Sequence, residues 1–222
     1  MRGTSSGRCL KLQKIVLMNG TLKTGKMDSR EAILSAVKKN KPDVAALPDI
    51  PRFAPLTNDP IVQFIEVATG IGSAVIHSSS IEDITAFYKE KISSDKFIIN
   101  GITELGQTNI DAFSDHNAAQ LSAVEFLFLK GKLGVAENGA VWLTESVIVN
   151  RMLPFICKNL VFLLEAKDIV GTMHHAYDQI NISEEGYGVF IAGPSKTADI
   201  EQSLVIGAHG PLSLHIFILS EK

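Results

Sequence analysis

Short runs of apolar residues alternate with amphipathic segments along most of the chain. Seven runs have the length and apolar content of buried strands: 73–77, 96–100, 124–129, 140–144, 160–165, 188–192 and 214–219. Apolar residues recur at helical spacing in four segments: 60–69, 80–91, 168–180 and 197–206. Residues 101–117 and 130–139 are polar or turn-rich. Strands that alternate with helices favour a sheet covered on both faces, so the pattern predicts a three-layer α/β/α fold with a mostly parallel sheet.

The first 27 residues differ from the rest in composition, because they are basic and contain no acidic residue. We expect residues 1–27 to form a disordered leader. The alternative is an arm that binds nucleic acid, which a whole-chain net charge of −3 does not favour.

A helix is predicted to begin at Asp28, because Glu31 follows it at capping-box spacing. Pro42 ends this helix, and residues 42–60 contain five prolines, which is typical of an extended connector. The chain is therefore predicted to have three parts: a leader at 1–27, a helix with a Pro-rich arm at 28–57, and an α/β domain at 58–222. We expect the arm to pack on the domain or on a neighbouring subunit, so a homo-oligomer is compatible with the sequence.

Composition excludes several classes of protein. The 222 residues include only two cysteines, Cys9 and Cys157, too few for a Cys₄ zinc site or a cysteine-ligated iron–sulfur cluster within one chain. No apolar stretch approaches the ~18 residues that cross a bilayer, and the N-terminus lacks the core of a signal peptide. We therefore expect a cytoplasmic protein with no membrane insertion, no nucleic-acid partner, no metal and no cofactor.

The segment GPSKTADIE offers a first candidate site, because it follows an apolar strand and opens a predicted helix. Free N–H groups at a helix N-terminus attract anions, and a lysine adds positive charge. The residues expected to bind a small anionic ligand here are Gly193, Pro194, Ser195, Lys196 and Thr197. A capped helix without a ligand explains the same residues equally well.

Acidic residues and a histidine flank this segment. Asp199 and Glu201 lie in the first turns of the predicted helix, where they complement its dipole or place acid groups beside a ligand. The turn at 207–211 contains His209 and Gly210. His209 is either a general base or hydrogen-bond donor for the site, or a turn histidine satisfied by backbone groups.

The sequence AENG at 136–139 is a second candidate site. Asn138 and Gly139 form a turn dipeptide between apolar segments, so Glu137 is expected near the tip of the turn. One interpretation is a hairpin turn with a solvated glutamate. The other is a carboxylate presented into a cleft, as nucleophile or base, with the glycine leaving room for a ligand.

The sequence gives less support for a metal site or a reactive cysteine. Adjacent residues on a helix point about 100° apart, so His174 and His175 cannot readily bind one ion together. His174 and Asp178 have helical ligand spacing but lack further ligands nearby. We expect Cys157 to be a buried structural thiol.

Five segments together resemble one protein family. The segment GPSKTADIEQSLVIGAHGP closely resembles the C-terminal signature of the LUD domain, the lactate-utilization family, and AENGAVWLT resembles its AETG-type turn and strand. RMLPFICKNL resembles the next element, which carries Arg151 as a further site residue. SREAIL and PDIPRF are similar to the start of lactate-utilization protein C, so the resemblance covers roughly 28–222. Asn138 and Lys158–Asn159 depart from the family pattern, which has threonine and often histidine there.

The resemblance implies a fold like the NagB/RpiA/CoA-transferase superfamily. It also implies a role beside iron–sulfur lactate-utilization proteins that oxidise L-lactate to pyruvate, with this chain as the cluster-free member. The AENG turn is similar to the glutamate turn of class I CoA-transferases, in which the glutamate accepts the acyl group. Three functions remain open: a lactate-utilization component that binds a small anionic ligand, a CoA-transferase- or phosphosugar-isomerase-like enzyme using Glu137, and an assembly module without a ligand.

Overall fold

The computed structural model describes residues 28–46, 59–200 and 203–220. The chain divides into two compact units, Met1–Arg52 and Phe53–Lys222. In the first unit, α1 (Ser29–Lys39) follows Asp28 at its N-cap, although the Asp28 side chain makes no capping hydrogen bond. The predicted leader and most of the Pro-rich connector lie outside the described residues.

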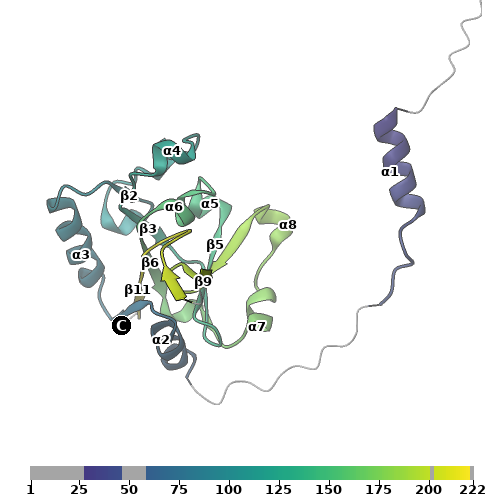
Figure 1. Cartoon of the computed structure of the whole chain (residues 1–222). Coiled ribbons are helices and arrows are strands. Elements are labelled where there is room, and N and C mark those ends of the chain that lie inside the picture. Colours follow the sequence, from purple (N-terminus) through teal and green to yellow (C-terminus); the bar gives the residue numbers. More distant parts are fainter. Residues whose placement is uncertain (1–27, 47–58, 201–202, 221–222) are drawn as a thin grey trace, which may run out of the picture. The chain divides into compact units, whose positions relative to one another are not determined.

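A five-stranded parallel sheet forms the centre of the second unit, with strand order β1-β11-β6-β3-β2 (Figure 1). Its strands are β1 (Ala74–Ser78), β2 (Ile98–Asn100), β3 (Phe126–Lys130), β6 (Asn159–Glu165) and β11 (Ser213–Leu219). These strands coincide with five of the predicted apolar runs. The mixed α/β fold with a mostly parallel central sheet is confirmed.

Each face of this sheet buries its own core because side chains alternate along the strands. Phe128 and Leu163 lie on one face, where they join the cluster that includes Ile84 of α3 (Glu82–Ser93). Phe162 lies on the other face, where it joins the larger cluster with Phe64 of α2 (Pro60–Gly70). Asp59 caps α2 by accepting a hydrogen bond from the Ile61 N–H at 2.9 Å, and Pro60 occupies the first turn.

A second, four-stranded sheet of order β7-β4-β5-β8 contributes to the larger core. It contains β4 (Leu133–Val135), β5 (Ala140–Thr144), β7 (Ile169–Val170) and β8 (Gly188–Ile191). β5 pairs antiparallel with both β4 and β8, whereas β4 pairs parallel with β7. The predicted turn-rich segment 130–139 therefore contains a strand, and helices are not the only elements that pack on the central sheet.

The predicted helix at 168–180 is wrong. Residues 166–168 form a 3₁₀ turn, η3 (Ala166–Asp168), after which β7 pairs with β4. A shorter helix, α7 (Met173–Tyr177), begins only after Thr172, whose hydroxyl accepts a hydrogen bond from the His175 N–H at 3.3 Å. Strand pairing and the Gly171–Thr172 break outweigh the helical spacing of the apolar residues.

The predicted helix at 197–206 is also wrong, because the segment forms an antiparallel hairpin of β9 (Lys196–Ile200) and β10 (Ser203–Ile206). Its residues include Thr197, Val205 and Ile206, whose β-branched side chains favour strands. Backbone hydrogen bonds fix the base of the hairpin: the Ser195 N–H donates to the Pro211 carbonyl, and the Gly207 N–H donates to the Ser195 carbonyl, both at 2.9 Å.

Short helical turns complete the described part of the second unit: η1 (Thr103–Leu105), η2 (Ile110–Phe113), α4 (Ala118–Leu121), α5 (Glu145–Ile148), α6 (Leu153–Ile156) and α8 (Ile182–Glu185). Within the described ranges, every helix is too short or too polar to cross a membrane.

Candidate functional site

The two sequence motifs meet at the C-terminal end of α2. The AENG turn reaches it through Gly139, where an added Cβ would lie 2.9 Å from the Ala68 Cα. The GPSK segment reaches it through Lys196, whose ammonium donates a hydrogen bond to the Ile71 carbonyl. Gly193 lies against the same carbonyl, because a Cβ there would be 2.9 Å from the Ile71 oxygen. The fold thus brings both motifs to one helix end, although they are more than 50 residues apart. We call these contacts the α2 junction.

The AENG segment is the tight turn of the β4–β5 hairpin. The Asn138 carboxamide oxygen accepts a hydrogen bond from the Ala140 N–H at 3.0 Å, and the Gly139 N–H donates to the Val135 carbonyl at 2.9 Å. The Glu137 N–H donates to the Gly171 carbonyl at 3.1 Å, while Glu137 itself is exposed. The turn therefore presents a carboxylate to solvent at a fixed backbone position.

No helix follows the GPSK segment, because residues 196–200 form β9. The helix dipole and the free N–H groups that were expected to attract an anion are therefore not present there. Gly193 and Pro194 are buried in the turn between β8 and β9, whereas Lys196 is exposed. Lys196 caps a helix C-terminus instead. Its ammonium has three N–H donors, so one bond to the Ile71 carbonyl leaves two for another acceptor.

The other residues predicted for this site have different positions. Gly210 packs on Ser195, because an added Cβ would lie 3.0 Å from the Ser195 Cβ, and His209 beside it is exposed. Asp199 lies in β9, and Glu201 lies outside the described residues. Asp199 is therefore in a strand and not in the first turn of a helix.

A buried hydroxyl lies in the connection between α2 and β1. Ser73 is 5% exposed, and its Oγ has no hydrogen-bond partner. Its neighbour Gly72 contacts the GPSK segment, since a Cβ there would lie 3.5 Å from Pro194 and 3.8 Å from Lys196. Buried polar atoms are normally paired, so this hydroxyl at the α2 junction is a group that a water or a ligand would satisfy.

Arg151 belongs to a different cluster. Its guanidinium pairs with the Glu145 carboxylate at 2.6 Å and lies over the Tyr187 ring at 4.5 Å from the centroid. Arg151 lies in the connection between α5 and α6, where the ion pair is largely exposed to solvent. The ion pair and the aromatic contact give Arg151 a structural role, whatever else it binds.

Sequence reasoning missed a charged cluster at the carboxyl ends of two central strands. Lys130 ends β3 and pairs with Glu104, at 2.5 Å, and with Glu165, which ends β6, at 3.0 Å. Partial burial opposes the charged forms, but hydrogen bonding to the carboxylates raises the pKa of Lys130 and lowers the pKa of Glu104. Burial raises the pKa of Asp168, close to the same charges. A charged residue directly after an apolar run, as in FLFLK and VFLLE, was the available signal.

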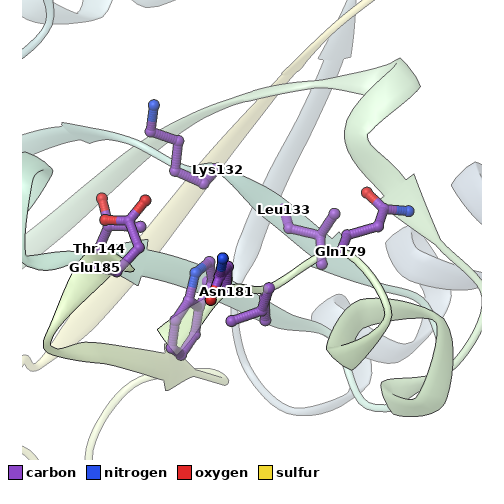
Figure 2. Close-up of a pocket in the computed structure, with 8 residues that line it drawn as sticks. Lys132, Leu133, Thr144, Gln179, Asn181 and Glu185 are labelled. Carbon is purple, nitrogen blue, oxygen red and sulfur yellow. The ribbon is translucent and has the colours of Figure 1, made fainter. Parts of the chain in front are cut away.

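A pocket of about 190 Å³ opens at the end of the β4–β5 hairpin opposite the AENG turn, and Figure 2 shows the residues that line it. Strand residues form one wall, and the segment between α7 and α8 forms the other. The lining residues are Lys132, Leu133, Trp142, Thr144, Gln179, Ile180, Asn181 and Glu185. Trp142 is 7% exposed and stacks on Phe190 at 4.6 Å between ring centroids.

Cys157, the cysteine within the described residues, is buried. Burial raises the pKa of the Cys157 thiol to about 12, so this thiol stays protonated and unreactive at neutral pH. Across residues 28–46, 59–200 and 203–220, no group of three or more His, Cys, Asp or Glu side chains is arranged to hold a metal ion.

Comparison with known proteins places the chain in a family. A model described as the LUD domain matches residues 11–219. The chain belongs to the LUD domain family. A crystal structure of a DUF162 family protein from Deinococcus radiodurans has a similar fold, with a TM-score of 0.55 and 17% identity over 74% of this chain and 99% of that chain.

Curated relatives of this LUD domain chain include several proteins named lactate utilization protein C. The protein from Geobacillus thermodenitrificans is 30% identical over 126 residues, which cover 54% of this chain and 49% of the relative. The protein from Geobacillus kaustophilus is 31% identical over a stretch that covers 53% of this chain and 48% of the relative. The protein from Bacillus subtilis is 33% identical over a stretch that covers 41% of this chain and 40% of the relative. The chain thus spans about half the length, or less, of the curated relatives it matches.

Proposed function

We propose that this LUD domain protein is a cluster-free component of a lactate-utilization system, in which it acts beside iron–sulfur proteins during the oxidation of L-lactate to pyruvate. The observation that carries the proposal is the family match across residues 11–219 together with relatives named lactate utilization protein C. Only two cysteines are present in the sequence, so redox centres built on cysteine clusters would belong to the partner proteins.

The second part of the proposal is a small anionic ligand at the α2 junction. Lys196 supplies an exposed ammonium with unused donors, and Glu137 supplies an exposed carboxylate on a turn packed against the same helix end. The unpaired hydroxyl of Ser73 lies in the connection that these motifs contact. The basis for anion binding is therefore the Lys196 ammonium, which has to outweigh the negative end of the α2 dipole beside it.

Growth on L-lactate tests the role of the protein. A strain without this gene is expected to grow poorly on L-lactate and normally on pyruvate, and the wild-type gene is expected to restore growth. Purified protein is also expected to retain iron–sulfur proteins of the same system in an anaerobic pull-down. Unimpaired growth of the deletion strain on L-lactate would contradict the proposal.

Thermal shifts test the ligand site. L-lactate, pyruvate and inorganic phosphate are the probes, because a ligand that binds only the native state raises the melting temperature. Lys196→Met is expected to abolish the shift, measured against the melting temperature of the unliganded variant. Lys89→Met, which changes an exposed lysine on α3, is the matched control and should leave the shift unchanged.

An acyl-transfer function is the second candidate, and one observation favours it: the exposed Glu137 carboxylate at a tight turn. A carboxylate nucleophile needs this access to attack an acyl group. If Glu137 has that role, Glu137→Gln abolishes turnover of an acyl-CoA while ligand binding persists. Wild-type protein that never forms a covalent adduct with an acyl-CoA would remove this candidate.

A further inference from the structure

The pocket at the open end of the β4–β5 hairpin lies away from the α2 junction. Leu133 pairs with Trp142 at the open end of the hairpin, whereas Val135 pairs with Ala140 beside the AENG turn. A volume of about 190 Å³ is below the ~300–1,000 Å³ typical of sites for drug-sized ligands and cofactors. The pocket therefore suits a small metabolite and is too small for a nucleotide or a coenzyme A ester.

The pocket lining contains one lysine, Lys132, which is available for a ligand, whereas the nearby Lys130 is already paired. Lys130 and Lys132 flank Gly131, and Lys130 is held between Glu104 and Glu165. Lys132 is exposed, and it enters no ion pair with another residue of the described part. Its backbone is fixed, since the Lys132 N–H donates to the Trp142 carbonyl at 3.0 Å.

The lining contains one carboxylate, that of Glu185, while Asp168 outside the lining lies within electrostatic range of Lys132. Glu185 ends α8, is half-buried and likewise forms no ion pair within the residues that the structure describes. Figure 2 shows the Lys132 ammonium and the Glu185 carboxylate toward one end of the pocket, with the Gln179 carboxamide toward the other. The lining thus carries one positive and one negative charge that do not neutralise each other directly.

The remaining lining is apolar or neutral. Leu133, Ile180 and Trp142 supply apolar surface, and Thr144 and Asn181 supply uncharged hydrogen-bonding groups. Trp142 cannot easily move aside, because it covers Gly188 so closely that an added Cβ there would meet the indole at 2.2 Å. The pocket lining therefore combines apolar surface with two opposite charges.

We propose that this pocket binds a small zwitterion, an α-amino acid with a short apolar side chain, with its carboxylate on Lys132 and its ammonium on Glu185. A monocarboxylic acid without an amine would satisfy Lys132 but leave the Glu185 charge facing an anion. A zwitterion pairs both charges and places its side chain on Leu133 and Ile180. This inference does not rest on the proposed role in lactate utilization.

Ligands that differ in a single group on the α-carbon test the contribution of Glu185 separately from that of Lys132. L-alanine, L-lactate and propionate share a carboxylate and a methyl group, and differ in carrying an ammonium, a hydroxyl or a hydrogen on the α-carbon. L-valine and its 2-hydroxy analogue repeat the comparison with a larger side chain. Titration calorimetry on the full chain is expected to show binding of the amino acids at least about tenfold tighter than of the hydroxy acids, the discrimination given by one charge-assisted hydrogen bond.

Two substitutions then assign the charges. Glu185→Gln is expected to weaken L-valine binding by about tenfold or more, and binding of its hydroxy analogue by less than about twofold. Lys132→Met is expected to weaken both ligands. The matched controls are Glu184→Gln, the exposed neighbour on α8, and Lys89→Met, and both should bind L-valine as the wild type does.

Three results would overturn the proposal. One is tighter binding of the hydroxy acids, which would make the pocket a hydroxy-acid site and leave the proposed lactate-utilization role in place. Another is unchanged L-valine binding in Glu185→Gln. The third is the absence of binding by any of these ligands at millimolar concentration. Failure of the lactate-utilization role is seen separately, in growth of the deletion strain on L-lactate.

Discussion

Gly139 is a single position where the backbone conformation and a close contact both require glycine. Its φ of +66° lies in the left-handed region, and an added Cβ would meet the Ala68 backbone at 2.9–3.0 Å. Gly139→Ala is therefore expected to lower the free energy of unfolding by about 1–3 kcal/mol, measured by urea denaturation. Gly70→Ala, at the end of the same helix with open space around it, is the control. Its expected effect is neutral or stabilising by up to ~1 kcal/mol, and equal losses in both variants would contradict the prediction.

His215 is a second residue with a measurable consequence, this time for the dependence of stability on pH. It lies on β11 with its ring 5.0 Å from the Phe87 ring. Burial lowers the pKa of His215, and the nearby Lys91 charge lowers it further. The unfolded chain then takes up a proton more readily than the folded chain, so stability is present above the ordinary histidine pKa of about 6.5 and is lost as pH falls below it.

His215→Gln tests this linkage. The variant is expected to lose less stability than the wild type between pH 7.5 and pH 5.5, as followed by denaturant unfolding at each pH. His175→Gln, at an exposed position on α7, should keep the wild-type dependence. A His215→Gln variant with the same slope as the wild type would show that other groups cause the loss.

At the scale of elements, the β9–β10 hairpin predicts a pattern of amide hydrogen exchange that differs from the pattern of a helix. The Ser195 N–H donates to the Pro211 carbonyl at 2.9 Å, a long-range bond that exists only when the hairpin base is closed. Amide hydrogen exchange is therefore expected to be slow at Ser195 and Gly207 and fast at the exposed turn residue Ala208. Fast exchange at Ser195 with slow exchange at consecutive residues from about 201 to 206 would indicate the helix instead.

The same elements show how far the sequence predicts the structure. The central strands were predictable, because runs such as residues 160–165 are continuously apolar and have the length of a strand; the observed strand is Asn159–Glu165. The hairpin was not, because apolar spacing in a ten-residue segment fits a helix and a hairpin alike. Its two strands pair with each other, and the hydrogen bond from the Ser195 N–H to the Pro211 carbonyl that closes its base joins residues outside the segment.

The candidate sites were also predictable from the sequence only where local residues determine the structure. That Glu137 lies in a turn was predictable from the Asn-Gly dipeptide that follows it. That Lys196 bonds the end of α2 was not, because Ile71 is 125 positions away. The pocket that includes Lys132 was equally hidden, since one of its walls is the segment between α7 and α8, where the sequence predicted a helix through residue 180.

At the scale of the whole molecule, the buried core of the described residues belongs to one of the two units of the chain. The helix α1 buries none of its residues, and its apolar side chains Ile33, Leu34 and Val37 are 46–63% exposed. The buried clusters of the described residues lie entirely in the second unit. A variant without residues 1–52 is therefore expected to unfold within about 3 °C of the full chain in a thermal melt, a difference of under ~1 kcal/mol.

Phe64→Ala in α2 provides the contrast within the second unit. Its ring is fully buried in the larger core, so removing it is expected to cost about 3–5 kcal/mol and to lower the melting temperature by roughly 6–20 °C. The family match begins at residue 11, so the truncated protein is the right material for testing whether residues 11–52 serve partner binding rather than folding. If truncation destabilises the protein as much as Phe64→Ala does, the first unit packs on the second, because exposed apolar side chains contribute to stability only when they become buried.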